Sequence, residues 1–86
     1  MPVILWTSHA RQRQEEWRIK TGITKEEIEE LVSHPRQIVE GDGEILIAQA
    51  RRGDGLLRAA FRYFAENKVI ITVYWTSKTS KYWRNS

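Results

Sequence analysis

Cysteine is absent from this 86-residue sequence, and only two histidines occur. Without cysteine the chain can form no disulfide, no thiolate nucleophile and no zinc site that needs sulfur ligands. The two histidines have no paired carboxylate spacing, so we expect neither a metal site nor a cofactor. Stability must then come from packing alone.

Long hydrophobic runs are also missing. No apolar segment approaches the roughly 20 residues that cross a bilayer. The opening MPVILWTSHARQRQ becomes polar too early for a signal peptide. We therefore expect a cytoplasmic protein without a membrane segment, folded as a single domain over residues 1–86 with one modest core.

Acidic residues are scarce in the second part of the chain. Residues 1–50 hold six Lys or Arg against nine Asp or Glu, a net of −3, whereas residues 51–86 hold eight against two, a net of +6. A localised positive field favours an anionic partner, either nucleic-acid phosphates or an acidic protein. The alternative is an ordinary solvated basic surface.

Two helices are predicted near the start, after an opening segment, VILWT, with strand composition. Ser8 can cap the first helix, Ala10 and Trp17 share one face, and Gly22 fits just past its end. In the second, Thr24 and Glu27 form a capping box and His34-Pro35 stops the helix. Its apolar face comprises Ile28, Leu31 and Val32.

Strands separated by turns are predicted from Gln37 onward. The segments QIVE, EILIAQA, LLRAAFRYF and VIITVYWT are divided by turns that carry Gly, Asp or Asn. This order predicts an α+β fold, with an N-terminal strand and two helices packed on one face of an antiparallel sheet of about four to five strands.

Strand alternation divides the last two strands between two sheet faces. The expected core face comprises Leu57, Ala59, Phe61, Tyr63, Val69, Ile71, Val73 and Trp75. Arg58 and Arg62 then lie on the other face, near Thr72 and Tyr74, where no helix is expected. Such a group suits a phosphodiester and a stacked base. The alternative is a solvated face that the arginine stems cover.

The closing SKTSKYW mixes lysines with aromatics. If it leaves the sheet near Thr76, Lys78 and Lys81 can reach phosphate while Tyr82 or Trp83 stacks on a base. Alternatively, the two aromatics cover the edge of the core. Two further arginines, Arg51 and Arg52 in the RRGDG turn, are candidate phosphate ligands, although such a segment is most often only a turn.

Four segments together resemble a known family. They are SHARQR with His9 and Arg13, the segment Gly22 to Glu40, LLRAAFRYF with Arg58, and the closing VIITVYWTSKTSKYW. The chain resembles the RelE-type ribonuclease toxin superfamily, close to its BrnT-like branch and their relatives of uncharacterised function. The resemblance implies a microbial-RNase-like fold with a cleft on the sheet. It also implies metal-independent endoribonuclease activity and an antitoxin encoded beside the gene.

Metal-independent RNA cleavage uses the 2′-hydroxyl as nucleophile, so the site must move protons and stabilise a charged phosphorane. His9, at the first turn of a helix, suits a base better than an acid. Arg58 is the first candidate for phosphate stabilisation and Arg13 the second, while Lys78 or Tyr82 can assist proton transfer. In the alternative reading, His9 only bonds locally at the helix start.

Three functions therefore remain open. The first is a toxin-like endoribonuclease of a toxin–antitoxin system, which acts on RNA either free or on the ribosome. The second is a nucleic-acid-binding module without catalysis, with Arg51, Arg52, Arg62, Thr72, Tyr74 and Lys81 as RNA-binding candidates. The third is an interaction subunit whose basic groove accepts an acidic antitoxin segment.

Overall fold

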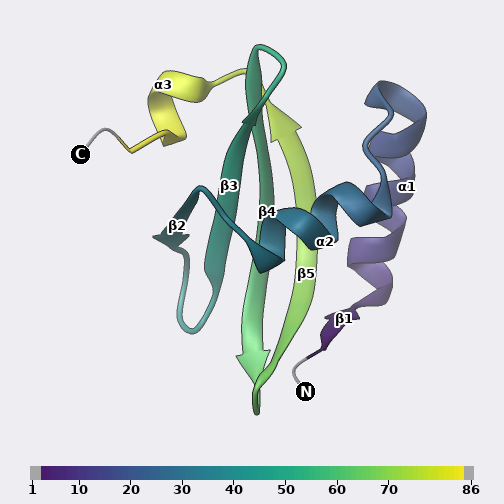
Figure 1. The fold of residues 1–86 in the computed structure, drawn as a ribbon, viewed down its shortest axis with the longest axis vertical. Coiled ribbons are helices and arrows are strands. Elements are labelled where there is room, and N and C mark those ends of the chain that lie inside the picture. The colour runs from purple at the N-terminus through teal and green to yellow at the C-terminus, as the bar shows by residue number, and fades with distance from the viewer. Residues whose placement is uncertain (1–2, 85–86) are drawn as a thin grey trace.

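The computed structural model describes residues 3–84. The α+β class predicted from the sequence is confirmed (Figure 1). In chain order the elements are β1 (Ile4–Trp6), α1 (Ser8–Thr21), α2 (Lys25–Ser33), β2 (Gln37–Glu40), β3 (Leu46–Arg52), β4 (Gly55–Phe64), β5 (Asn67–Thr76) and α3 (Thr79–Tyr82). Within these residues, no helix is both long and apolar enough to cross a membrane.

The sheet has five strands in the order β1-β5-β4-β3-β2. The predicted meander from β2 to β5 is antiparallel throughout. β1 differs, because it pairs in parallel with β5, with Ile4 opposite Lys68 and Trp6 opposite Ile70. The sheet is therefore mixed rather than purely antiparallel.

The start of α1 lies one residue from its predicted position. Thr7, not Ser8, is the N-cap, and its hydroxyl accepts a hydrogen bond from the Ala10 amide at 3.1 Å. The same hydroxyl lies 3.1 Å from the Ile70 carbonyl, to which it can donate. Thr7 therefore also ties the helix start to β5. The helix ends at Gly22 as predicted, with φ of 73°, a conformation that glycine adopts without strain.

The ends of α2 follow the sequence closely. Thr24 accepts from the Glu27 amide at 3.1 Å, and the helix ends at Ser33 with His34 at the C-cap. Only this half of the capping box is seen, because the Glu27 carboxylate instead pairs with Arg52 Nε at 2.5 Å. The second helix is thus joined to β3 as well as capped.

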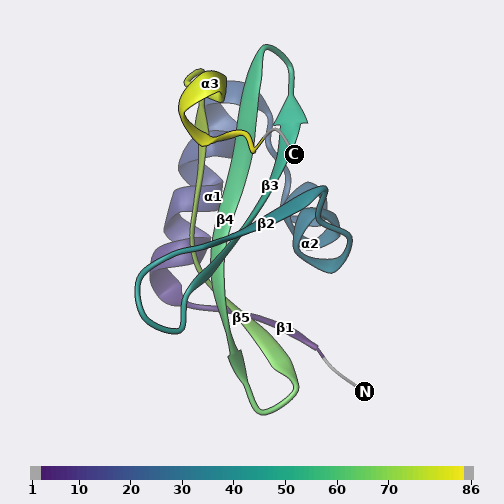
Figure 2. The same cartoon turned by 90° about the vertical axis from the view of Figure 1, so that its left-hand side faces the viewer.

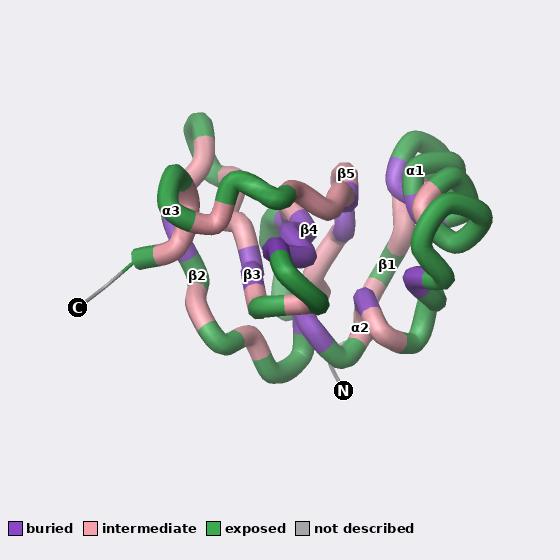
Figure 3. Tube along the Cα trace, turned by 90° about the horizontal axis from the view of Figure 1, so that it is seen from above, coloured by how far each residue is buried: buried purple, intermediate pink, exposed green. Residues whose placement is uncertain are grey.

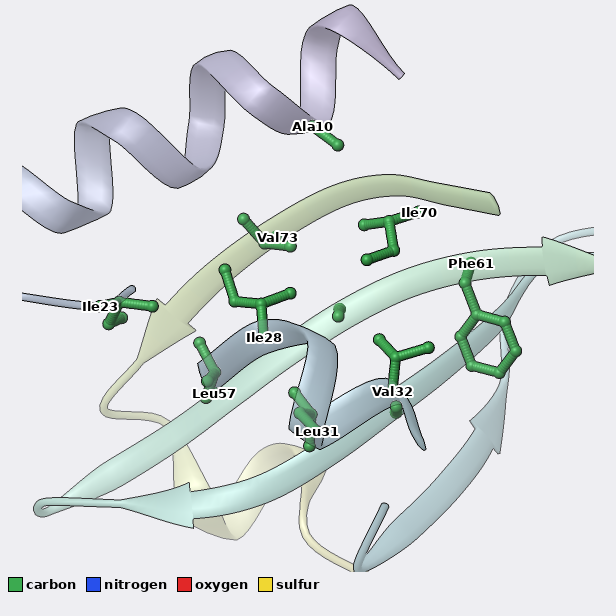
Figure 4. Packing of buried hydrophobic residues seen from close by; sticks show 11 residues of the cluster. Ala10, Ile23, Ile28, Leu31, Val32, Leu57, Phe61, Ile70 and Val73 are labelled. Carbon is green, nitrogen blue, oxygen red and sulfur yellow. The ribbon is translucent and has the colours of Figure 1, made fainter. Parts of the chain in front are cut away.

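One hydrophobic core lies between the helices and the sheet (Figure 4). α2 packs against β3 and β4, while α1 runs alongside β5. The buried apolar residues are Ala10, Ile23, Ile28, Leu31, Val32, Ala48, Leu57, Ala59, Phe61, Ile70 and Val73. Trp17 and Trp75 pack against this cluster. The predicted apolar face of α2 is therefore confirmed in full.

A β-bulge changes the predicted faces at the start of β5. Ala60 lies opposite Thr72, but Phe61 lies opposite Ile70, so Ile71 is an extra residue. Ile70 is consequently fully buried with the core, and Val69 and Ile71 are only partly buried. The prediction that Val69 and Ile71 face the core was wrong, because simple alternation assumes an unbroken register.

The chain turns back after β5, and α3 lies on the face of the sheet opposite α2 (Figures 2 and 3). The prediction of a sheet face without a helix was therefore wrong. A four-residue helix such as α3 is too short to produce a readable hydrophobic period. It covers one end of the face that carries Arg58.

Candidate nucleic-acid interface

Four polar side chains form a row across the sheet on the face that α3 covers. The strand register places Gln37 opposite Gln49, Gln49 opposite Arg58, and Arg58 opposite Tyr74. Residues paired in this way point to the same face of a sheet. We call Gln37, Gln49, Arg58 and Tyr74 the polar row.

Arg58 is the centre of the polar row. It is only 5% exposed, which is unusual for an arginine. Its Nε donates to Gln49 Oε1 at 2.9 Å, and its Nη1 donates to the Tyr74 hydroxyl. The guanidinium carbon lies 4.0 Å from the centre of the Tyr82 ring, which α3 supplies, and 5.5 Å from that of Tyr74. Two aromatic rings and a neutral amide thus surround a buried cation.

The partners of Arg58 are all neutral. Among residues 3–84, no carboxylate lies within ion-pair distance of it. Hydrogen bonds and aromatic faces offset part of the cost of burying a cation, but they do not neutralise its charge. Nη2 makes no hydrogen bond within these residues. Because no buried side-chain nitrogen there lacks a partner, Nη2 retains contact with solvent. Nη2 is thus the part of the guanidinium that remains open to a further hydrogen-bond acceptor.

Two glutamines hold α3 in place over Arg58. Gln49 is fully buried, and its Nε2 donates to the Tyr82 carbonyl at 2.9 Å and to Gln37 Oε1 at 2.8 Å. Gln37 in turn accepts from the Arg84 amide at 3.0 Å. The position of the Tyr82 ring therefore depends on the same row that positions the guanidinium.

Positive charge accumulates around α3. From residue 77 to residue 84 the sequence has three Lys or Arg and no Asp or Glu. Lys78 and Lys81 are exposed at this helix, and Lys81 Nζ lies 5.2 Å from the centre of the Tyr82 ring. Nearby, the Arg51 guanidinium stacks 4.7 Å from the Trp83 ring. Cations and aromatic rings therefore alternate along this surface.

The structure brings several of the predicted residues together. Arg58 and Tyr74 contact each other, Tyr82 covers Arg58, and Lys78 and Lys81 precede Tyr82 in the same short segment. Arg62 and Thr72 lie on the same face, opposite Val69 and Ala60 respectively, and Arg62 is exposed. These residues can contact one extended ligand.

Other predicted residues lie elsewhere. His9 is exposed in the first turn of α1, which begins beside β1, at the other end of the molecule from α3 (Figure 1). Arg13, also on α1, pairs with Glu16 at 2.9 Å. The structure does not bring His9 or Arg13 to Arg58, because α1 packs along β5 at the edge of the sheet.

Arg52 has a structural role in this fold. It pairs with Glu27, donates to the Thr21 carbonyl at 3.2 Å, and its own carbonyl accepts from Trp75 Nε1 at 2.9 Å. These bonds join β3 to α2, to the end of α1 and to β5. Arg52 therefore does not belong to the surface around Arg58.

Sequence reasoning missed the two glutamines of the polar row. Gln49 interrupts the otherwise apolar segment EILIAQA, a signal that a buried polar partner is required. That partner becomes identifiable only when the register of β3 against β4 is known. Gln37 carries no such signal, since it begins an exposed edge strand.

Comparisons with known proteins place the chain in one family. Neither the curated proteins nor the solved structures include a match to it. A family model does match residues 6–75, which run from the last residue of β1 through nearly all of β5 and include Arg58 and Tyr74. The chain therefore belongs to the family described as a domain of unknown function, DUF4258.

Proposed function

We propose that this protein binds single-stranded RNA on the face covered by α3, with Arg58 as the central phosphate ligand. The observation that carries the proposal is an arginine that is only 5% exposed and whose hydrogen-bond partners are all neutral. A phosphate oxygen supplies the negative charge that these partners lack, through a charge-assisted hydrogen bond.

The aromatic side chains favour a single strand over a duplex. Tyr82 and Trp83 are partly buried beside exposed Lys78 and Lys81. Unpaired bases can stack on such rings, whereas the bases of a duplex are already stacked on each other. Lysines next to the rings can contact the phosphates between successive bases.

We propose the same face as the site of metal-independent RNA cleavage. This is the activity that the resemblance to the RelE-type ribonuclease toxins implies. Arg58 would stabilise the charge of the phosphorane that forms after 2′-hydroxyl attack. The Tyr82 hydroxyl, on the ring that lies over Arg58, and the exposed Lys78 and Lys81 amines of the same segment are the groups that would transfer protons. His9 is not included, because α1 carries it away from this face.

An acidic protein segment, such as that of an antitoxin, is a second candidate ligand. Lys78, Lys81 and Arg84 around α3, with no acidic residue between them in the sequence, attract carboxylates as well as phosphates. Competition between such a peptide and RNA would show that the two ligands share the surface.

Fluorescence anisotropy with a short labelled RNA, in the presence of EDTA, tests the binding proposal. Wild type is compared with Arg58→Met and with Arg11→Gln, a control that removes an exposed arginine of α1. We expect Arg58→Met alone to weaken binding, by about tenfold or more. Equal affinity of all three proteins would contradict the proposal.

The same samples, separated on a denaturing gel, test cleavage. Products that end in a 2′,3′-cyclic phosphate, and that Arg58→Met does not form, are the expected result. RNA that binds but stays intact would support a binding module without catalysis and would contradict the proposed ribonuclease activity.

A further inference from the structure

A hollow lies beside α3, at the point where β3 extends beyond β2. β2 begins at Gln37, opposite Gln49, whereas β3 continues to Arg52. The space that this difference leaves has a volume of about 510 Å³ and is lined by Arg36, Gln37, Ala50, Arg51 and Trp83. Its size and position suit a small ligand rather than an extended one.

The lining combines an aromatic ring with two arginines. Trp83 is partly buried, and Arg36 and Arg51 are exposed. Neither arginine forms an ion pair within residues 3–84. The two nearby glutamates have other partners, since Glu27 pairs with Arg52 and Glu30 lies 3.2 Å from His34. The hollow therefore offers a stacking surface and two positive charges that no carboxylate offsets.

The backbone of β3 adds hydrogen-bonding groups. Successive residues of a strand direct their N–H and C=O groups to opposite sides. Within Ala50 and Arg51, one residue therefore directs these groups away from β4, to the side where β2 is missing. The side-chain amide of Gln37 is already hydrogen-bonded to Gln49 and to the Arg84 backbone. It therefore lines the hollow without offering a free hydrogen-bonding group.

We infer that this hollow binds the base of a nucleotide, which takes the place of the Arg51 guanidinium on the Trp83 ring, while Arg51 and Arg36 turn toward the adjoining phosphates. An aromatic ring, an open strand edge and two guanidiniums match the π-face, the polar edge and the phosphate of a nucleotide. No acidic side chain lines the hollow, so a cation is a poor alternative.

The hollow is directly connected to the proposed RNA site. Gln37 lines it, and Gln49 joins Gln37 to Arg58 through two hydrogen bonds. Trp83 follows Tyr82, which covers Arg58. The inference rests on the proposed function, because the base in the hollow belongs to a nucleotide adjacent to the phosphate at Arg58.

Nuclear magnetic resonance of the full chain tests the inference, with adenosine 5′-monophosphate and a short single-stranded RNA as separate probes. The Trp83 indole N–H signal, assigned by its loss in Trp83→Phe, reports on the hollow. We expect both probes to shift it, and the mononucleotide to shift it in Arg58→Met as well.

Affinity measurements on variants complete the test. Trp83→Leu should weaken RNA binding by at least about fivefold, the lower end of the loss when a stacking aromatic is removed, whereas Trp83→Phe should retain most of the affinity. Arg36→Gln and Arg51→Gln should weaken binding, and Arg11→Gln on α1 should not. Circular dichroism confirms that each variant is folded.

The outcomes separate the hollow from the RNA site. RNA binding that depends on Arg58 but neither shifts the Trp83 signal nor weakens in Trp83→Leu would overturn the inference and leave the proposed function intact. Mononucleotide binding without RNA binding would support a nucleotide site and contradict the proposed function. No binding of either probe would overturn both.

Discussion

The two faces of this sheet differ in the side chains they bury and in how their cations are paired. On the core face, apolar side chains pack against α1 and α2, and the cation at its rim, Arg52, pairs with Glu27. On the α3 face, Arg58 is buried with neutral partners only, and exposed Lys78 and Lys81 have no ion pair within residues 3–84. The cation of the core face is thus neutralised by a carboxylate, whereas these cations of the α3 face have no carboxylate partner among residues 3–84.

The free-energy cost of burying a charge distinguishes Arg58 from the apolar residues of the core face. A buried cation without a counterion contributes little to stability, and an apolar residue of similar size is often as stable. The burial of Arg58 is therefore difficult to explain by stability alone. The two glutamines hold α3 in place, and Gln49 and Tyr74 fix the orientation of the guanidinium.

The largest expected effect is the loss of stability when a side chain of the core face is truncated, compared with one of the α3 face. Phe61→Ala removes a fully buried ring from the core and should lower the free energy of unfolding by about 3–5 kcal/mol. Arg62→Ala, the next residue and on the other face, should change it by less than about 0.5 kcal/mol. Urea denaturation measures both, and similar losses in the two variants would contradict the assignment of the core.

A substitution on the α3 face should reduce RNA affinity more than it reduces stability. Arg58→Met should lower RNA affinity by about 1.5–3 kcal/mol, the range for a hydrogen bond to a charged group. Its free energy of unfolding should change by less than that, because methionine can fill the space without a buried charge. A variant that binds RNA normally but unfolds readily would show that Arg58 is structural.

Gln49 tests whether the polar row positions α3. Gln49→Leu removes the acceptor of Arg58 Nε and the donor to the Tyr82 carbonyl, at an expected cost of about 1–3 kcal/mol in the free energy of unfolding. Hydrogen exchange should also accelerate from residue 79 to residue 83. The matched control, Gln12→Leu on the exposed side of α1, should leave exchange in α3 unchanged.

The salt dependence of RNA binding should resolve the smaller contributions of single lysines to affinity. If Lys78 and Lys81 each contact a phosphate, Lys78→Gln and Lys81→Gln should each reduce the slope of log affinity against log salt by about 0.7. Lys20→Gln on α1 should not alter it. An unchanged slope in all three would place the phosphate contacts elsewhere.

The smallest expected effect concerns an ion pair of α1. The hydrogen bond from Arg18 lowers the pKa of Glu15 below its usual value. Because the folded pKa is the lower one, the associated stabilisation is present above the unfolded pKa and is lost as pH falls through the folded value. The carbon resonance of the Glu15 carboxyl should titrate at higher pH in Arg18→Gln. RNA affinity should not change.

Local signals determined how much of the fold was predictable. The ends of α2 depend on adjacent residues such as Thr24 and His34, and they were predicted correctly. The predicted turn RRGDG was too long, because Arg51 and Arg52 belong to β3 and Gly55 to β4. The bulge at Ile71 and the parallel pairing of β1 depend on contacts between distant segments. No pattern within either segment carries that information.

The candidate site shows the same limit. Arg58, Tyr74 and Tyr82 were singled out from the sequence, and the structure brings them together. The burial of Arg58 was not predicted, because it requires α3 to fold back over the sheet. His9 was grouped with Arg58 because helix periodicity does not say against which edge of the sheet α1 packs.

The most direct test of the account is a titration of isotope-labelled protein with single-stranded RNA, followed by amide chemical shifts. We predict that the shifts concentrate at Gln37, Gln49, Arg58, Tyr74 and residues 78–83, with α1 and α2 unaffected. Shifts that concentrate around His9 on α1, or no shifts at all, would contradict the claim that the α3 face is the binding surface.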